Sequence, residues 1–265
     1  MIDSRQWAAC FCATLITLCQ TQAEIERPDR LPEITPPTGE SIQISIDRGA
    51  GFLKKIQNPN GSWGSPRQTK GLNIFAPVPG SHRAFQLAVT ALSIAALIET
   101  KGDDPNYVKT IRDAEDHLLA NLPNLRRATS VAIYNVWAHS YGIQALVRMR
   151  DRAKGDSERI AKVDKLIRGQ FGMLQRYESV DGGWGYYDFR LGAKQPASSS
   201  ISFVNGTALL AMHEAQTRGI EPPERLIKRA YAAIQRQRLP DHSYLYGEYL
   251  KWKPRRGINR PAGSL

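Results

Sequence analysis

Hydrophobic residues recur along the chain at two spacings, and both are typical of α-helices. In one kind of segment they fall on a single side of a helix, as expected for a helix with one face in water. The segments of this kind are 42–57, 105–122, 158–177 and 224–237. In the other kind nearly every position is apolar, so the helix must be buried from all sides. The segments of this kind are 85–98, 136–149 and 203–215.

No segment shows the alternation of a strand or a clear hairpin turn, so the pattern predicts an all-α protein. The two kinds of helix alternate, and aligning Ala91, Ala145 and Ala208 gives steps of 54 and 63 residues from one apolar helix to the next. Asp104, followed by Pro105, and Ser157 are the expected N-caps of two amphipathic helices. The simplest arrangement is a ring of helical hairpins with the apolar helices inside.

The end of the first amphipathic segment carries a spaced set of residues in the stretch RGAGFLKKIQNPNGSWG. Its constrained positions are Arg48, Gly49, Phe52, Leu53, Gln57, Gly61 and Trp63. This stretch resembles the QW motif of the squalene and other triterpene cyclases, which share an α/α toroid with the β-type subunits of protein prenyltransferases. The resemblance covers roughly residues 42 to 250 and implies a toroid, here with about three and a half hairpins and therefore incomplete.

A second, degenerate copy of the motif is formed by Arg168, Gly169, Phe171, Gln175, Gly182 and Trp184. A third trace has Gln237 followed by Ser243 and Tyr244 in place of Gly-x-Trp. A Gln near a helix end can bond to unpaired backbone groups, and a Trp can cover that end and donate its indole N–H. The motif therefore predicts a brace between hairpins, which carries no chemistry of its own.

The catalytic residues that the resemblance would imply are missing. The cyclases use an Asp-x-Asp-Asp motif, and the nearest acidic cluster, Asp103 and Asp104, fits a turn and a helix cap better. The prenyltransferases hold zinc with Asp, Cys and His, but all three cysteines of this chain, Cys10, Cys12 and Cys19, lie at its N-terminus. We therefore expect no metal and no cofactor.

The N-terminal residues have the pattern of a secretory signal peptide, with an apolar run from Trp7 to Leu18 and a cleavage site after Ala23. This predicts export to the periplasm or the medium, with a retained membrane anchor as the alternative. The predicted organisation is a signal peptide at 1–23, a proline-rich linker at 24–40 and a toroid domain at 41–265. The pattern calls for another inner helix after residue 265, so we expect either missing C-terminal hairpins or self-association to complete the ring.

Aromatic residues gather where loops lead into the apolar helices. These residues, with two histidines, are candidates to line the mouth of a central cavity for an apolar ligand, although packing in the core is the alternative. The candidates are His82, Tyr134, Trp137, His139, Tyr141, Tyr186, Tyr187 and Phe203.

Catalytic candidates are few. Asp181 and Asp188 flank a glycine-rich loop and are candidates for a carboxylate pair, with His139 as a third candidate, whereas turn formation is the simpler role for the two acids.

The net charge of +11 arises from 36 basic and 25 acidic residues, and residues 251–260 carry five basic residues and no acid. Such a run suits anionic lipid or polysaccharide, with a solvated surface or tail as the simpler alternative, and no nucleic-acid recognition motif accompanies it. The leading hypothesis is an exported binding or scaffold module. The alternative is an enzyme that acts on a polyprenyl or terpenoid lipid or a polysaccharide, with its catalytic residues in the loop 181–188 or beyond residue 265.

Overall fold

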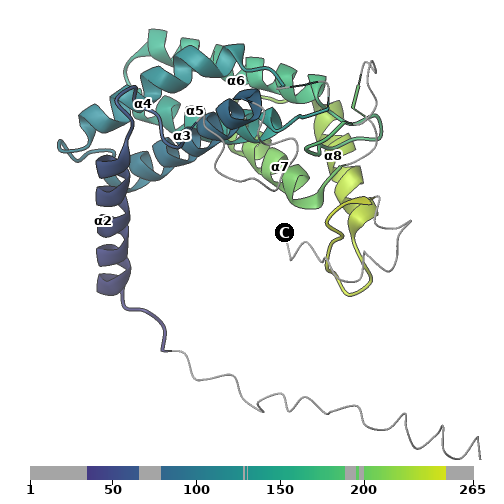
Figure 1. Ribbon diagram of the computed structural model, residues 1–265, viewed down its shortest axis with the longest axis horizontal. Coiled ribbons are helices and arrows are strands. Elements are labelled where there is room, and N and C mark those ends of the chain that lie inside the picture. Colours follow the sequence, from purple (N-terminus) through teal and green to yellow (C-terminus); the bar gives the residue numbers. More distant parts are fainter. Residues whose placement is uncertain are drawn as a thin grey trace, which may run out of the picture. The chain divides into compact units, whose positions relative to one another are not determined.

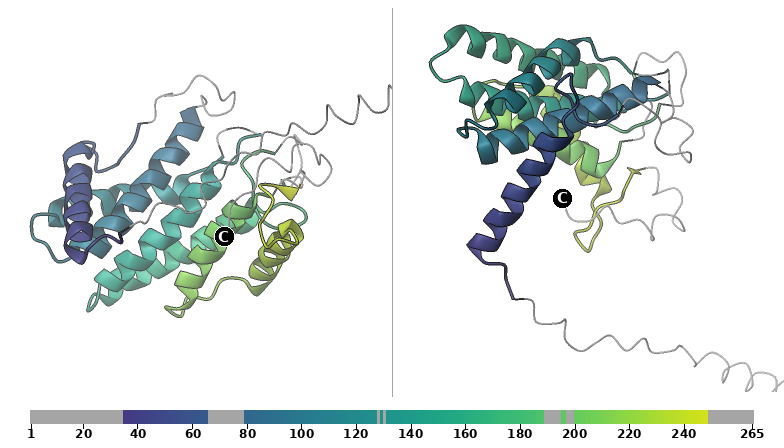
Figure 2. Two further views of the ribbon diagram at one scale, coloured as in Figure 1. Left: turned by 90° about the horizontal axis from the view of Figure 1, so that it is seen from below. Right: turned by 60° about the vertical axis from the view of Figure 1, so that its left-hand side comes forward.

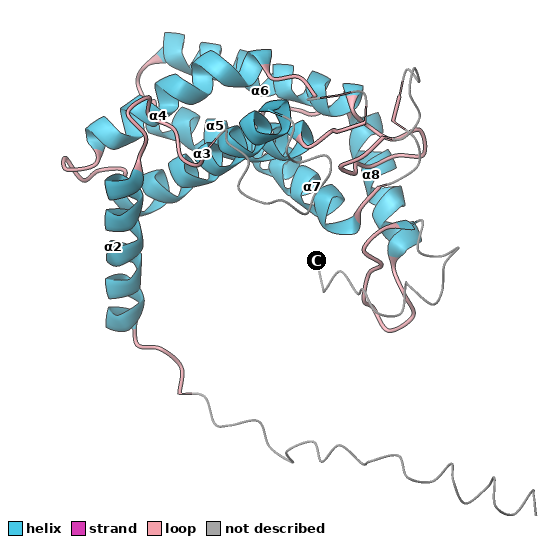
Figure 3. Cartoon of the chain, in the orientation of Figure 1, coloured by secondary structure: helices cyan, strands magenta, loops and turns pink. Residues whose placement is uncertain are grey.

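The computed structural model describes residues 35–65, 79–127, 129, 131–188, 195–196 and 200–248. These residues form seven α-helices, one short 3-10 helix and isolated β-bridges, which confirms the all-α prediction (Figure 3). The helices are α2 Gly39–Ile56, α3 Pro79–Lys101, α4 Val108–Asn121, η1 Leu122–Asn124, α5 Asn135–Arg152, α6 Ser157–Arg176, α7 Ser202–Gln216 and α8 Glu224–Gln237.

Two of the expected helix starts are wrong. Asp104 does not cap α4, because its carboxylate accepts from the backbone and side chain of Asn106 in a preceding turn, and the helix begins only at Val108. The cap of α6 is Asp156, whose side chain accepts from the backbone N–H of Arg159, and not Ser157. Both errors follow from runs of neighbouring residues that can each serve as a cap.

The chain divides into two compact units, residues 1–42 and residues 43–265. The predicted signal peptide lies outside the described residues, as do most of the predicted linker and the basic run at 251–260. In the second unit the helices form two layers, and Figures 1 and 2 show α3, α5 and α7 side by side. Each of these inner helices packs against the amphipathic helix that follows it, α4, α6 or α8.

The core lies between and within these layers. Ala91, Ala145 and Ala208, which mark the three apolar helices, are fully buried, because small side chains let neighbouring inner helices approach closely. The part of α3 from His82 to Lys101 is long and apolar enough to cross a membrane by length and composition, and here it is a core helix that contacts α4 and α5.

A turn of one particular geometry follows α2, and we call residues 57–63 the first turn. The Asn58 N–H donates to the Ser62 carbonyl at 2.9 Å, and the Gly61 N–H donates to the Asn58 carbonyl at 2.9 Å. Trp63, which is 1% exposed, donates its indole N–H to the Leu53 carbonyl in the last turn of α2 at 2.8 Å. The indole therefore satisfies a helix-end carbonyl that would otherwise be unpaired.

The same turn follows α6, in residues 178–184, the second turn. Ser179 donates to the Gly183 carbonyl at 2.8 Å and Gly182 to the Ser179 carbonyl at 2.9 Å. Trp184 is fully buried and donates its indole N–H to the Leu174 carbonyl at 2.8 Å. Donor and acceptor are ten residues apart in both turns, so the two tryptophans hold equivalent positions.

A third turn, residues 238–244, follows α8. Leu239 donates to the Ser243 carbonyl at 2.8 Å, and His242 donates to the Leu239 carbonyl at 3.0 Å. Its last residue, Tyr244, is only partly buried. The backbone of the turn therefore recurs without a tryptophan.

Steric contacts require glycine at the fifth residue of the first two turns. Gly61 has φ +82°, and a Cβ added there would lie 2.1 Å from the Asp113 carbonyl oxygen. Gly182 has φ +98°, and a Cβ added there would lie 2.6 Å from the Arg229 carbonyl oxygen. The turn thus presses its backbone against the next outer helix, α4 or α8. In the third turn, His242 has φ +68° at the corresponding place.

The polar partner at the start of the turn differs from the expectation. In the first turn, Gln57 donates to the Gly61 carbonyl at 3.0 Å and to the Thr110 carbonyl of α4 at 2.8 Å. In the second turn, the position six residues before Trp184 is Glu178, which is 1% exposed and binds Arg229 of α8 at 2.6 Å. Gln175 is exposed, because the register counted back from the tryptophan places Glu178 there.

Other motif residues lie on the surface. Arg48 and Gly49 are exposed, and the Phe52 ring is 58% exposed on α2. Arg168 and Gly169 are exposed on α6, whereas Phe171 is 3% exposed in the core.

Candidate ligand-binding face

Aromatic rings form one connected cluster at the end of the inner layer where the loops enter α5 and α7. Neighbouring ring centroids are 4.8 to 6.4 Å apart, which is contact distance for aromatic pairs. The rings are those of Phe85, Tyr134, Trp137, Tyr141, Tyr186, Tyr187, Phe203 and Tyr246. Six of the eight sequence candidates are therefore brought together.

Short backbone pairings between loops position these rings. The Ile133 N–H donates to the Tyr186 carbonyl at 2.8 Å, and the Ser202 N–H donates to the Tyr246 carbonyl at 3.2 Å. The chain before α5 is thus paired with the loop after the second turn, and the start of α7 with the chain after the third turn. These pairings bring together tyrosines from three distant segments of the chain, namely Tyr134, Tyr186 with Tyr187, and Tyr246.

The tyrosine hydroxyls of the cluster bond to one another. Tyr246 donates to the Tyr186 hydroxyl at 2.8 Å, and the hydroxyls of Tyr134 and Tyr187 form a second, short pair. Burial and then the Tyr246 hydrogen bond raise the pKa of Tyr186, and burial raises the pKa of Tyr141. Both phenols therefore stay neutral at physiological pH, and these two rings add no charge to the cluster.

From this cluster an apolar stripe runs along the inner helices. Trp137 and Tyr141 on α5 stack at 5.6 Å, and Trp137 also stacks on Phe203 of α7 at 5.8 Å. Farther along lie side chains that are large, apolar and 42% to 51% exposed. These are Val89 and Leu92 on α3 and Leu210 on α7.

The spacing i, i+4, i+7 keeps residues on one side of a helix, and on α3 all three positions are large and apolar. On α5 the third position is Gln144, and on α7 the second is Thr207. On α3 the stripe is Phe85, Val89 and Leu92, and on α7 it includes Phe203 and Leu210. We call the surface formed by Phe85, Val89, Leu92, Trp137, Tyr141, Phe203 and Leu210 the α3/α5/α7 face.

The far end of this face is closed by an ion-pair bridge. Arg148 of α5 binds Glu99 of α3 at 2.8 Å and Glu214 of α7 at 2.7 Å, so one guanidinium links all three inner helices. Trp137 and Arg148 are eleven residues apart on α5, or ~16 Å at the rise of an α-helix. The face is thus mainly apolar over ~16 Å, with Gln144 and Thr207 as polar positions within it, between tyrosine hydroxyls at one end and charges at the other.

Among the described residues, neither of the two histidine candidates makes a ring contact within the cluster. His139 is fully buried against α6, where Nδ1 is 2.8 Å from the Gln170 side-chain oxygen and Nε2 is 3.3 Å from the Asn135 amide. Its ring stacks on Tyr177, and burial lowers its pKa to about 4. His82 is 8% exposed, and its Nε2 has no hydrogen-bond partner among the described residues.

The two carboxylate candidates have different cationic partners. Asp188 is 1% exposed and binds Arg127 at 3.3 Å, whereas Asp181 is partly exposed and lies 3.8 Å from Arg236 of α8. Both also make further interactions. Their surroundings are those of structural ion pairs.

Within the described part of the chain, no three His, Cys, Asp or Glu side chains are grouped closely enough to hold a metal ion. The chain matches no protein-family model, no curated protein and no solved structure. The face must therefore be interpreted from its own chemistry.

Sequence reasoning missed five residues of this region: Phe85, Val89, Leu92, Leu210 and Tyr246. All of them except Tyr246 belong to helices whose apolar composition predicts burial on every side. The signal that could have found them is the shared spacing of the largest side chains in the three apolar helices.

Proposed function

We propose that this protein is a binding module for an apolar, elongated ligand of the isoprenoid type, and that the α3/α5/α7 face holds it. The observation that carries the proposal is the exposed, mainly apolar face itself, because exposed apolar patches of this kind mark binding sites. Val89, Leu92 and Leu210 expose two-fifths to half of their surface on it.

The chemistry of the face favours a hydrocarbon with one polar end. Stacked rings supply a broad surface without charge, and the Tyr186–Tyr246 hydroxyl pair at 2.8 Å can accept or donate to an alcohol. A terpenoid alcohol combines these properties, because its chain is apolar and its single hydroxyl needs a partner.

The repeated turn supports the proposed kinship with the α/α toroids of triterpene cyclases and prenyltransferase subunits. Trp63 and Trp184 brace helix ends through equivalent hydrogen bonds, as expected for a structural motif. In a toroid, the surface formed by inner helices would face the central cavity. We further propose that residues 1–23 direct export, a segment that lies outside the described residues.

An enzymatic function has less support. Asp181 and Asp188 are held by different arginines, and His139 is enclosed in the core with a pKa of about 4. None of these groups is placed to meet a ligand on the α3/α5/α7 face.

Calorimetric titration with farnesol, a C15 isoprenoid alcohol, tests the proposal. We expect binding to the wild-type protein, and an at least tenfold weaker affinity in Leu92→Glu and Leu210→Glu, because a carboxylate would be desolvated by the bound chain. Both positions are exposed, so the variants should fold normally.

Tyr231→Glu is the matched control, since Tyr231 is 57% exposed on α8 and lies outside the face. Its affinity for farnesol should equal that of the wild type. The proposal fails if neither farnesol nor squalene binds the wild-type protein, or if the control loses as much affinity as the two face variants.

A further inference from the structure

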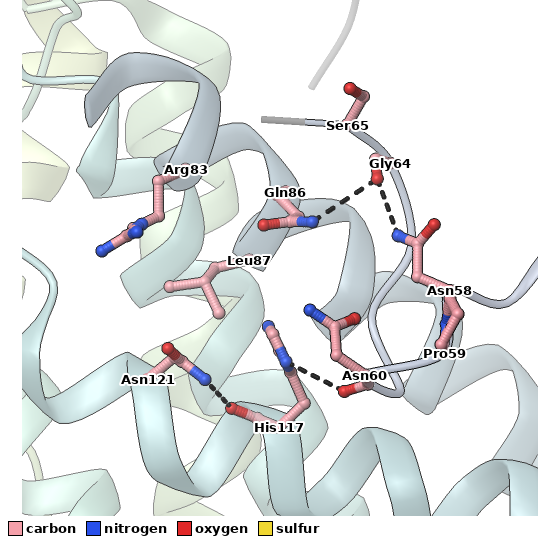
Figure 4. A pocket seen from close by; sticks show the side chains of 10 residues that line it. All are labelled: Asn58, Pro59, Asn60, Gly64, Ser65, Arg83, Gln86, Leu87, His117 and Asn121. Atoms are coloured by element: carbon pink, nitrogen blue, oxygen red, sulfur yellow. Dashed lines mark hydrogen bonds between the residues drawn. The ribbon is translucent and has the colours of Figure 1, made fainter. Parts of the chain in front are cut away.

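Two adjoining cavities lie on another side of α3. The larger one lies between that helix, the first turn and α4 (Figure 4), and the smaller one between α3, the end of α4 and residues 124–127. One has a volume of about 520 Å³ and the other about 290 Å³, and they share Arg83 and Asn121. We call them the polar cavity pair. The larger one is of the size of small-molecule sites.

The larger cavity is lined mainly by side-chain amides and other neutral polar groups. Figure 4 shows them converging from the turn, from α3 and from α4. The lining residues that carry polar side chains are Asn58, Asn60, Ser65, Arg83, Gln86, His117 and Asn121. No acidic residue is among the described residues that line either cavity.

The tautomer of His117 follows from its partner. Its Nδ1 lies 3.1 Å from the Asn60 carbonyl oxygen, which can only accept, so Nδ1 carries the proton. Burial lowers the pKa of His117, and the ring is therefore neutral at physiological pH. Nε2 is then left as an acceptor in the wall of the cavity.

The amides are oriented by bonds to the protein, and each leaves one end for a ligand. Asn121 donates its amide to the His117 carbonyl at 2.8 Å, and Gln86 donates to the Ser62 hydroxyl at 3.0 Å, so an acceptor oxygen remains on both. The Asn60 side-chain oxygen accepts from Ser62, which leaves its amide as a donor. The His117 Nε2 and the side-chain oxygens of Gln86 and Asn121 are therefore neutral acceptors in the cavity wall.

The charge of the cavity pair is positive. Arg83 is exposed, and no described residue makes a hydrogen bond or ion pair with its guanidinium. Among the described residues, Arg126 in the smaller cavity bonds to the Pro123 and Leu125 carbonyls and to no carboxylate, whereas Arg127 is paired with Asp188. Two guanidinium groups are therefore left to bind an anion.

These properties select a class of ligand. A free phosphate offers acceptors and would leave the acceptors of His117, Gln86 and Asn121 unused. An ammonium group would seek a carboxylate, and none lines the cavities. Hydroxyl groups suit the acceptors, and a carboxylate suits Arg83. We propose that the polar cavity pair binds an acidic sugar, with its hydroxyls in the larger cavity and its carboxylate at Arg83 and Arg126.

Calorimetry with digalacturonate and with its neutral dimethyl ester tests this proposal. We expect the acid to bind at least tenfold more tightly than the ester, and Arg83→Gln to abolish that difference. Arg112→Gln is the matched control, because Arg112 is an exposed arginine of α4 outside both cavities. Its affinity for digalacturonate should be unchanged.

Asn121→Leu tests the hydroxyl side of the site, and it should weaken digalacturonate and the ester alike. The proposal is overturned if neither digalacturonate nor a glucuronate-containing disaccharide binds with a Kd below about 10 mM. It is also overturned if acid and ester bind equally, or if inorganic phosphate competes while Asn121→Leu has no effect. Farnesol binding should persist in Arg83→Gln, so this site and the α3/α5/α7 face can fail independently.

Discussion

Gly61 shows how much of the fold depends on a single missing side chain. Its positive φ and its closeness to the Asp113 carbonyl, where an added Cβ would lie at 2.1 Å, are separate constraints. Only the steric contact depends on the neighbouring helix α4, so its contribution to stability can be measured separately from that of the backbone strain.

We expect Gly61→Ala to destabilise the protein by more than Gly155→Ala. Gly155 also has a positive φ, +90°, but nothing lies within 4 Å of an added Cβ there. Gly155→Ala should therefore lose about 1 kcal/mol of unfolding free energy, from backbone strain alone. Urea denaturation of both variants checks the difference, and equal losses would mean that α4 moves away without penalty.

Buried His139 predicts a pH dependence of stability. Its pKa falls from an ordinary 6.5 to about 4, so between these values the unfolded chain binds a proton that the folded protein does not. Stability should therefore decrease as the pH falls from about 6.5 to about 4, by roughly 3 kcal/mol from this residue. Urea titrations across this range measure the loss.

His139→Gln is the control for that effect, because carboxylates elsewhere also titrate at low pH. Gln keeps a polar group next to Gln170 without a proton-binding site. The slope of stability against pH between 6.5 and 4 should be shallower in this variant, and an unchanged slope would assign the effect to other groups.

At the scale of elements, the turns hold the outer helices through their tryptophans. Trp184→Phe keeps an aromatic ring but leaves the buried Leu174 carbonyl without its indole donor. We expect a loss of about 2 kcal/mol of stability. Trp137→Phe should be close to neutral, because no described group accepts from that indole and Trp137 is partly exposed. Thermal unfolding of the two variants separates the hydrogen bond from the ring.

The ion pair of Glu178 and Arg229 joins the second turn to α8. Glu178 is 1% exposed, so Arg229→Met would leave a buried charge without its partner and should destabilise the protein by on the order of 3 kcal/mol. Arg225→Met, one turn earlier on α8 at an exposed position without a described partner, should have little effect. Equal melting temperatures for both variants would argue against the pair.

The sequence predicted the helices well because their apolar spacing is set by burial along each element. All seven expected segments are helical. The N-caps at Asp104 and Ser157 were wrong because a cap depends on local backbone angles, which neighbouring residues can satisfy equally well. Glu178 was missed because its role depends on Arg229, a contact 51 residues away.

At the scale of the whole molecule, the inner helices α3 and α7 are buried on one side and exposed on the other, whereas α5 between them is buried or partly buried at every position. Leu92→Asp on α3 should be tolerated, because Leu92 is 42% exposed, whereas Ile94→Asp should prevent folding, because Ile94 is fully buried two residues later. Circular dichroism of the two variants checks this. Unfolding of both would show that the exposed side of α3 is covered in solution.

The candidate face was predictable only in part, because α3 and α7 are each buried on one side only. The composition of α3 and α7 indicates burial on every side, and it cannot show that a stripe with Val89 and Leu210 stays uncovered. Tyr134, Tyr186 and Tyr187 were found because they mark the loop ends, whereas Tyr246 was missed, and their grouping depends on backbone pairings such as Ile133 with Tyr186. The kinship with α/α toroids stays a prediction.

The three turns are unequal in one respect that concerns how the native protein opens. The third turn places His242, with its Cβ, at φ +68°, and it ends in a half-buried Tyr244 instead of an enclosed indole. Strain and a weaker anchor both lower the free energy of local opening. Of the three turns, a protease should therefore cut first in the one at residue 242, and α8 should fray before the other outer helices held by such a turn.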